Sequence, residues 1–238
     1  MIAPDFLGLG FSDKPSGFDY TLQAQAHADA VDALLGFLGV DAVHVVAHDL
    51  GVRVTQEMIA RRETPSSLAT VMSLVLLNGA MCPEAYRPRL IQRLLASPLG
   101  AWLGPRVPLK AFDRAMRALF GVQTPPAPEL LDDFWALVEQ GHGRQVTHAV
   151  GRFWRPDAAQ RDRLVGALLR SRRPLRVING AADPNSGRHM VHRLLALAPL
   201  TDVFSFDHIG HWPHIEHVEA TAAARLDFLN PLASDKPG

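Results

Sequence analysis

The chain has 238 residues, carries 24 basic and 24 acidic side chains, and contains a single cysteine, Cys82. This length fits one large domain or one domain with an insertion. Zero net charge without long basic runs argues against nucleic acid or an anionic membrane as a partner, and one cysteine excludes an internal disulfide or a cysteine-based metal cluster. The sequence shows neither a bilayer-spanning apolar stretch nor a signal-peptide pattern, so we expect a cytoplasmic protein without a metal or other cofactor.

The chain opens with a loop and a helix. Residues 1–5 look like the tail of a strand, since apolar residues there run into a turn. Residues 6–16 are rich in glycine, and we interpret them as a structural loop. A phosphate-binding loop would need a full strand before it and a helix opening at Ser12, and neither is indicated. Residues 21–38 have the apolar spacing of an amphipathic helix that ends at Gly39.

The next segment, residues 47–51, has the sequence Ala-His-Asp-Leu-Gly and directly follows the apolar run 42–46. A helix-like stretch, residues 52–62, comes after it. A strand, a turn with small residues at both ends and a helix form the context of a nucleophile elbow, with Asp49 in the nucleophile position. A carboxylate there attacks a saturated carbon and forms an alkyl ester. No Gly-x-Ser-x-Gly motif occurs in the chain, so a serine esterase is disfavoured.

Strands and helices alternate through much of the remaining chain. The predicted strands are residues 71–77, 174–178 and 202–206, and the predicted helices include residues 189–197 and 218–229. This alternation predicts an α/β protein with a parallel sheet covered on both faces.

The strand pattern is interrupted by a long helical segment. Amphipathic helices broken by prolines fill the chain from Met81 to about Arg170. Such an insertion between two sheet strands is expected above the carboxyl ends of the strands, as a lid. We therefore predict a core of residues 1–81 and 171–238 and a lid of residues 82–170.

Taken together, the motifs resemble the epoxide hydrolase and haloalkane dehalogenase branch of the α/β-hydrolase fold, including the mesoderm-specific transcript-like hydrolases. The resemblance covers essentially the whole chain. The segments that carry it are residues 4–15, 48–51, 77–84, Asp183 and residues 207–213. It implies an α/β-hydrolase fold with a helical lid. It also implies a two-step hydrolysis, in which an aspartate forms an alkyl-enzyme ester and a histidine-activated water hydrolyses it.

The resemblance implies a triad in the chain order nucleophile, acid, histidine. Asp49 is the nucleophile, Asp183 orients the imidazole and His211 activates water. Some relatives carry the acid after the preceding strand, where this chain has Asn78, and this favours Asp183. The pair Gly210 and His211 after the last strand favours His211 over its rivals. Those rivals are His208, His214 and His217.

The residue after Asp49 bears on which leaving group the site would accept. The backbone N–H of Leu50 is an expected oxyanion donor. Relatives commonly carry tryptophan at this position, whose indole holds a halide in dehalogenases. Leucine has no such donor, so dehalogenation is disfavoured unless Trp135 or Trp154 in the lid serves.

An epoxide needs a proton donor for its ring oxygen, and family members usually supply two lid tyrosines. The chain contains only Tyr20 and Tyr86, of which Tyr86 opens the lid segment. Tyr86 is therefore the candidate donor, alone or with His142 or His148.

The family pattern also implies several strands and a helix before Pro4, on the order of 50 residues. A His-Gly motif there supplies a second oxyanion N–H. Without these strands, the elbow strand lies at a sheet edge and half of the oxyanion hole is missing. We interpret Met1 as an internal methionine, because the nucleophile, acid and base are all present. The alternative is a truncated product that does not catalyse.

The sequence thus predicts a hydrolase for a small apolar electrophile, with an epoxide preferred. The alternatives are a haloalkane dehalogenase and a non-catalytic, truncated hydrolase-like scaffold. We expect a small-molecule substrate, no nucleic acid and no membrane insertion. The oligomeric state is left open.

Overall fold

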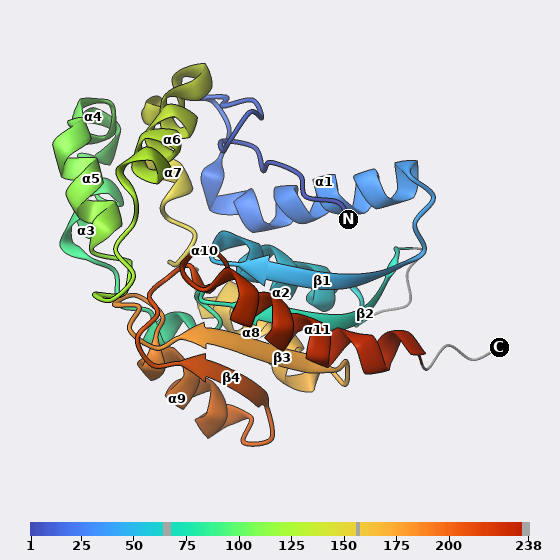
Figure 1. The fold of residues 1–238 in the computed structure, drawn as a ribbon. Helices are drawn as coiled ribbons and strands as arrows, with labels where there is room; N and C mark the ends of the chain where they lie inside the picture. Colours follow the sequence, from blue (N-terminus) through green and yellow to red (C-terminus); the bar gives the residue numbers. More distant parts are fainter. Residues whose placement is uncertain (64–67, 156–157, 235–238) are drawn as a thin grey trace.

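A computed structural model describes residues 1–63, 68–155 and 158–234 of the chain. In these residues, four parallel strands form one sheet in the order β1-β2-β3-β4 (Figure 1). The strands are β1 (Ala42–His48), β2 (Thr70–Leu77), β3 (Leu175–Gly180) and β4 (Asp202–Phe206). β1 lies at one edge, and β2 is the most deeply buried strand. The parallel sheet that the sequence predicts is confirmed.

Helices cover both faces of the sheet, as the β-branched and leucine-rich strands require. The core helices are α1 (Gln23–Phe37), α2 (Leu50–Arg61), α8 (Ala158–Arg170), α9 (Arg188–Leu197) and α11 (Val218–Ser234). Alternate residues of β2 point to opposite faces. Leu74 and Leu76 join the cluster formed with α2, α8 and α9, whereas Val75 and Leu77 pack with Ala224 of α11.

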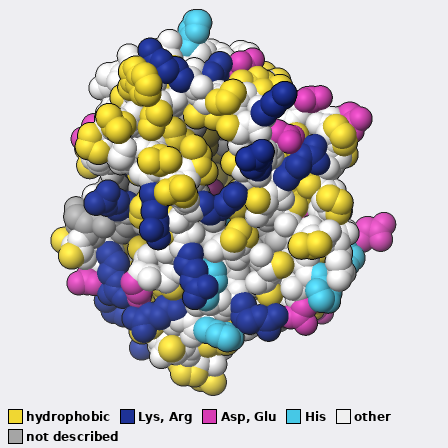
Figure 2. All heavy atoms as spheres, turned by 90° about the vertical axis from the view of Figure 1, so that its left-hand side faces the viewer, with side chains coloured by type: hydrophobic (Ala, Val, Ile, Leu, Met, Phe, Trp, Pro, Cys, Tyr) yellow, Lys and Arg dark blue, Asp and Glu magenta, His cyan; other side chains and the backbone are white. Residues whose placement is uncertain are grey.

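Short helices connect β2 to α8 and stand at the carboxyl ends of the strands (Figure 1). They are α3 (Leu90–Leu95), α4 (Gly100–Leu103), α5 (Leu109–Arg117), α6 (Pro128–Glu139) and α7 (Thr147–Val150). α8, which falls in the predicted lid range, packs against α2 and contributes Ala167 and Leu168 to the core. Figure 2 shows this side of the molecule, with hydrophobic side chains over the upper part, where the lid helices lie.

Several predicted element ends differ from the structure. The prediction of a strand tail at residues 1–5 is wrong, because this segment has no regular structure. Instead, the Asp5 carboxylate accepts a hydrogen bond of 2.8 Å from the Phe11 N–H. The first helix begins later than expected, since a 3-10 turn, Tyr20–Leu22, precedes α1. None of the helices in the described parts of the chain is long and apolar enough to cross a membrane.

Candidate active site

Asp49 lies at the sharp turn between β1 and α2. Its φ of 49° and ψ of −112° make it one of two non-glycine residues with positive φ in the described chain. Such a backbone conformation costs on the order of 1–3 kcal/mol and persists only where the surroundings enforce it. The Asp49 N–H donates to the Asn78 carbonyl at 2.9 Å, and the Asp49 carbonyl accepts from the Val52 N–H at 3.1 Å. The elbow expected from the sequence is therefore present.

The space that this turn needs is provided by a different glycine from the one expected. A Cβ added at Gly51 would meet only the Ala47 Cβ, at an ordinary contact distance of 3.6 Å. A Cβ at Gly79 would come within 2.8 Å of Val52 and 2.9 Å of the Asp49 carbonyl oxygen. Gly79 follows the neighbouring strand, β2, so sequence reasoning about the elbow itself did not identify it.

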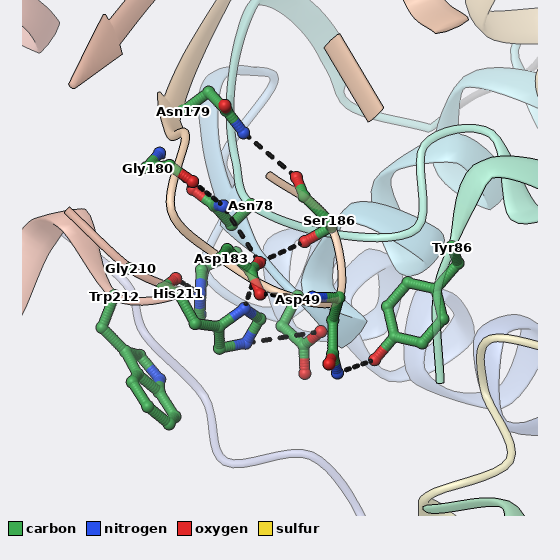
Figure 3. Close-up of polar contacts among 12 residues, drawn as sticks. Asp49, Asn78, Tyr86, Asn179, Gly180, Asp183, Ser186, Gly210, His211 and Trp212 are labelled. Atoms are coloured by element: carbon green, nitrogen blue, oxygen red, sulfur yellow. Dashed lines mark hydrogen bonds and ion pairs between the residues drawn. The ribbon is translucent and has the colours of Figure 1, made fainter. Parts of the chain in front are cut away.

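The acid and the base come from the ends of β3 and β4. His211 Nδ1 lies 2.9 Å from Asp183 Oδ2, and His211 Nε2 lies 3.7 Å from Asp49 Oδ1 (Figure 3). The second distance is an ion-pair contact, longer than a hydrogen bond. The side chains of Asp183 and His211 are 0% and 5% exposed, whereas that of Asp49 is 31% exposed. The three residues named from the sequence thus meet in one place.

Asp183 is ionised in a buried position because four donors surround it. Besides His211, it accepts hydrogen bonds from the Asn78 amide at 3.0 Å, the Ser186 hydroxyl at 2.6 Å and the Asn185 N–H at 2.8 Å. Burial alone would raise the pKa of Asp183, but the His211 charge and these bonds lower it to about 2. Sequence analysis considered Asn78 only as a missing carboxylate, and it did not find Ser186.

Two carboxylates control the protonation of His211. Burial would lower the pKa of the imidazole, but the charges of Asp183 and Asp49 raise it to about 10. Because Asp183 is ionised, Nδ1 carries the proton that it donates, and Nε2 faces Asp49. Any chemistry that removes the Asp49 charge therefore lowers the pKa of His211.

The Glu216 carboxylate holds the loop that carries His211. Glu216, at the end of α10 (Pro213–Glu216), accepts hydrogen bonds from the Gly210 N–H at 2.8 Å and the Trp212 N–H at 3.0 Å. The same carboxylate accepts 2.7 Å and 2.6 Å bonds from the Gly121 N–H and the Thr124 hydroxyl in the lid. Glu216 thereby ties the base loop to the lid.

His48, directly before the nucleophile, supports the same loop. Its Nε2 lies 2.8 Å from the His211 carbonyl oxygen, and the two rings are 4.6 Å apart. Burial and the neighbouring charges of His211 and His214 hold the pKa of His48 well below its usual value, so this ring is neutral. This contact gives His48 a role in supporting the loop that carries His211.

The rival histidines occupy other places. The His214 ring packs against the His48 ring at 4.7 Å, and the His217 ring lies 5.3 Å from Phe206. Among the described residues, His211 is the histidine hydrogen-bonded to Asp183.

Tyr86 lies beside the triad with its hydroxyl directed toward Asp49 (Figure 3). The hydroxyl oxygen accepts hydrogen bonds from Asn185 Nδ2 at 2.8 Å and Gln92 Nε2 at 3.1 Å. The Gln92 amide orientation is fixed, because its Oε1 accepts the backbone N–H of Arg89 at 2.8 Å. With two donors on its oxygen, the phenolic proton must be directed elsewhere.

Electrostatics keep this phenol protonated. Burial, and after it the Asp49 charge, raises the pKa of Tyr86. The two amides that bind its oxygen only partly oppose this shift. Tyr86 is therefore a hydrogen-bond donor at the site. Neither amide partner was found by sequence analysis, since their spacing from Tyr86 follows no motif.

A cavity of about 700 Å³ opens beside Asp49, Leu50 and His211, along β1 and between α1 and α2. Leu50 is the first residue of α2, so its N–H has no partner within the helix and remains available as an anion donor. Leu50 itself is 6% exposed.

The two lid tryptophans lie in different surroundings. Trp154 stacks on Tyr86, with ring centroids 5.9 Å apart, and its buried Nε1 has no hydrogen-bond partner in the described structure. Trp135 packs between Phe112 and Arg144 and lines a smaller cavity, of about 180 Å³, that includes Gln92 but neither Asp49 nor His211. A substrate contact by Trp135 stays a prediction.

The parts of the chain that the structure describes contain no group of three or more His, Cys, Asp or Glu side chains that could hold a metal ion. Cys82 is buried and unpaired, and burial raises the pKa of its thiol to about 12.

Comparison with known proteins gives the following similarities. Residues 1–224 match the Alpha/beta hydrolase family. The mesoderm-specific transcript homolog protein of Bos taurus is 34% identical over 97% of this chain and 70% of its own length. The putative hydrolase LipZ of Mycobacterium tuberculosis is 31% identical over 96% of this chain and 78% of its own. Haloalkane dehalogenase DbeA of Bradyrhizobium elkani has a TM-score of 0.78 at 20% identity, covering 98% of this chain and 81% of that one.

Proposed function

Because this chain belongs to the alpha/beta hydrolase family, we propose that it hydrolyses a small apolar electrophile, preferably an epoxide, through Asp49. The observation that carries the proposal is the position of Asp49 Oδ1. It lies on the strained elbow, 3.7 Å from His211 Nε2, and has no hydrogen-bond partner among the described residues. A carboxylate on a strained elbow with a histidine beside it fits the nucleophile of a covalent hydrolase.

In the first step, the Asp49 carboxylate attacks a ring carbon of the epoxide and forms an alkyl ester. The carbon–oxygen bond of the ring breaks, and its electron pair moves to the ring oxygen. That oxygen takes the proton from the Tyr86 hydroxyl, whose own oxygen is occupied by Asn185 and Gln92. Loss of the Asp49 charge in this step lowers the pKa of Tyr86 and so favours the transfer.

Esterification also prepares His211 for the second step. While Asp49 is ionised, the raised pKa of His211 keeps the ring protonated at neutral pH. When the Asp49 charge disappears, the ring releases this proton, which restores the Tyr86 hydroxyl. The neutral imidazole then accepts a proton from water, and the hydroxide attacks the ester carbonyl carbon of Asp49.

The second step returns every group to its starting state. The Leu50 N–H stabilises the oxyanion of the tetrahedral intermediate. When the carbon–oxygen bond of the ester breaks, the product alkoxide takes the proton of the regenerated carboxylic acid. The products are a diol, an ionised Asp49 and a protonated His211, so water and epoxide are the only species consumed.

A haloalkane is the second candidate substrate, because Trp154 offers a donor. Its buried, unpartnered Nε1 lies on a ring stacked over Tyr86. An indole N–H of this kind stabilises a departing halide without protonating it. Leu50 contributes no side-chain donor, which is why an epoxide remains the preferred substrate.

Intact mass of the His211→Gln variant tests the proposal. Without the base, the alkyl ester of Asp49 forms and persists, so incubation with a panel of epoxides and haloalkanes should add mass to the protein. An epoxide adds its full mass, whereas a haloalkane adds its mass less the halide and a proton. The double variant Asp49→Asn/His211→Gln should stay unlabelled, and His192→Gln, at an exposed position of α9, should turn over without accumulating an adduct.

Single turnover in ¹⁸O-water sharpens the result. Hydrolysis at the Asp49 carbonyl places ¹⁸O in the Asp49 carboxylate, which peptide mass spectrometry locates. Labelling at another residue would reject Asp49 as nucleophile. A folded His211→Gln protein that forms no adduct across the panel would reject the hydrolase and favour the non-catalytic scaffold.

A further inference from the structure

A second cavity, of about 790 Å³, shares no lining residue with the Asp49 cavity. Its walls come from the 3-10 turn before α1, from α1, α2 and α8, and from lid residues after α3 and α7. Small-molecule sites in proteins enclose about 300–1,000 Å³, so this space accommodates an organic ligand. The proposed hydrolase chemistry makes no use of it.

Positive charge gathers around this cavity. Arg53 of α2 and two residues that follow α7, Arg152 and Arg155, contribute guanidinium groups to its lining. No aspartate or glutamate occurs among the lining residues that the structure describes. The cavity is therefore cationic even though the whole chain has no net charge.

Arg53 is the buried member of this group. It is 3% exposed and donates one long hydrogen bond, 3.3 Å to Gln56 Oε1, while its Nε has no partner in the described residues. Glu57, on the same helix, does not neutralise it. One Glu57 oxygen accepts Arg61 Nε at 2.9 Å, and the other is bound by Arg163. Within the described parts of the chain, Arg53 is thus a buried cation without a dedicated counter-ion.

Such an arrangement is costly in the absence of an anion. Burial lowers the pKa of Arg53 to about 10, and the Glu57 charge offsets only part of that effect. Buried charges in proteins are normally paired and hydrogen-bonded, because desolvation otherwise penalises the charged form. An anion in the cavity would remove this penalty.

Four residues that line this cavity each carry a buried polar atom without a hydrogen-bond partner among the described residues. The atoms are the hydroxyl of Tyr20, Oε1 of Gln23 and the Nε atoms of Arg53 and Arg152. Buried polar groups rarely remain unsatisfied in native proteins, so a local cluster of them indicates a ligand. Three of these four atoms are donors, which matches an acceptor-rich ligand.

We propose that this cavity binds a small organic anion, whose carboxylate or phosphate head pairs with Arg53 and whose apolar part lies against Phe153 and Leu164. The planar guanidinium fork fits both kinds of head. Arg152 and Arg155 place further positive charge on the path to Arg53, and Arg155 is exposed at the surface. The volume exceeds that of an inorganic ion, which is why the ligand carries an apolar part.

Calorimetric titration with octanoate, octyl phosphate and neutral octanol tests the proposal. Wild type should bind at least one of the two anions and should not bind octanol. Arg53→Met, which keeps the volume but removes the charge, should weaken binding by about 10- to 100-fold. Arg188→Met is the matched control: it removes an exposed arginine paired with Asp207 and should leave the affinity unchanged.

Thermal unfolding of the same variants separates a ligand site from a structural arginine. Without ligand, Arg53→Met should unfold at the same or a higher temperature than wild type, because an unpaired buried charge is lost. With ligand, only wild type and Arg188→Met should be stabilised. If Arg53→Met does not fold, Arg53→Lys replaces it, since lysine keeps the charge but loses the fork and should bind more weakly.

The titrations can either support or overturn the proposed anion site. Tighter binding of octanoate or of octyl phosphate identifies the head group. Absence of binding to wild type, equal binding to Arg53→Met, or equal binding of octanol would overturn the proposal and leave Arg53 as a hydrated structural arginine. None of these readouts depends on hydrolysis, so the result is independent of the proposed function.

Discussion

The acid–base half of the site and the nucleophile half are built in opposite ways. Asp183 follows the interior strand β3 and His211 follows β4, and both side chains are almost fully buried and hydrogen-bonded. Asp49 follows β1, is 31% exposed, and has a strained backbone and one oxygen without a hydrogen bond among the described residues. The groups proposed to handle protons are thus fixed by many contacts, whereas the proposed nucleophile has few.

Close backbone contacts at two glycines position the two halves of the site. A Cβ at Gly180 would overlap the Gly210 carbonyl, so the loops of acid and base approach at van der Waals distance. On the other side, Gly79 gives room for the Asp49 turn. We therefore expect substitutions of Asp49 mainly to lower activity and substitutions of Asp183 mainly to lower stability.

The largest expected effect is the loss of activity on removing the nucleophile. Asp49→Asn should lower kcat/KM for any substrate that labels His211→Gln by about 10⁴-fold or more, because no other group forms the ester. Steady-state hydrolysis measures this loss, with Asp207→Asn, at an exposed position, as the control. If Asp49→Asn keeps an activity within tenfold of wild type, Asp49 is not the nucleophile.

A change in the buried acid should mainly affect stability. Asp183→Ala leaves His211, Asn78 and Ser186 without their shared acceptor. We expect the free energy of unfolding to fall by about 3–5 kcal/mol, as for other broken buried ion pairs. Urea denaturation measures it, and Asp207→Ala, in a surface ion pair, should cost less than about 1 kcal/mol. Equal losses in both variants would contradict the comparison.

Removing the Glu216 contacts between the His211 loop and the lid should have an intermediate effect on stability. Glu216→Ala removes the acceptor of three backbone N–H groups, those of Gly210, Trp212 and Gly121. A loss of about 2–4 kcal/mol in unfolding free energy follows from leaving partly buried donors unsatisfied. Glu139→Ala, at the exposed end of α6, is the control. If both variants unfold at the same urea concentration as wild type, the loop does not depend on Glu216.

Relieving the backbone strain at Asp49 should increase the free energy of unfolding. Asp49→Gly places a residue that tolerates positive φ in the strained position, so the free energy of unfolding should rise by about 1 kcal/mol while activity is lost. Asp41→Gly, which lies ahead of β1 and lacks a positive φ, should instead lower it by about 0.5–1 kcal/mol. A loss of stability in Asp49→Gly would show that the turn stores no strain.

The smallest effect is a change in pH dependence that connects the two halves. The pKa of His211 is raised to about 10 in the folded chain. Its contribution to stability is therefore fully present below the unfolded value near 6.5 and is lost as pH rises through 10. Asp49→Asn removes one of the charges that raise this pKa, so the alkaline loss should be complete at a lower pH and be smaller. Unfolding free energies between pH 6.5 and 10 test this, and identical curves would mean that Asp49 does not act on His211.

Much of the fold was predictable because its signals are local. The apolar run before Asp49 predicts β1, although the strand extends to His48, and the predicted range of β4 agrees with the structure. The strand prediction at residues 1–5 failed, since a short apolar segment without a pairing partner carries no information on sheet formation. Element ends differed where caps and 3-10 turns decide them, as before α1.

The candidate site was only partly predictable. Motifs placed Asp49, Asp183 and His211 in the right chain order, and the structure brings them together. The residues that hold them, Asn78 and Glu216, have no motif, because their partners lie on other elements. Asn78, for example, binds Asp183 across 105 positions of the chain.

Local sequence patterns are enough to predict the strand–turn–helix elbow, the parallel α/β layout and the three candidate reactive side chains. Each of these follows from local periodicity, small residues and chain order, which need no knowledge of distant contacts. Folding, in contrast, brings two amide donors to the Tyr86 oxygen, places Gly79 beside the Asp49 turn, and buries Arg53 without a counter-ion among the described residues. Burial and electrostatic shifts depend on groups brought together from separate elements, so they exist only once the chain has folded.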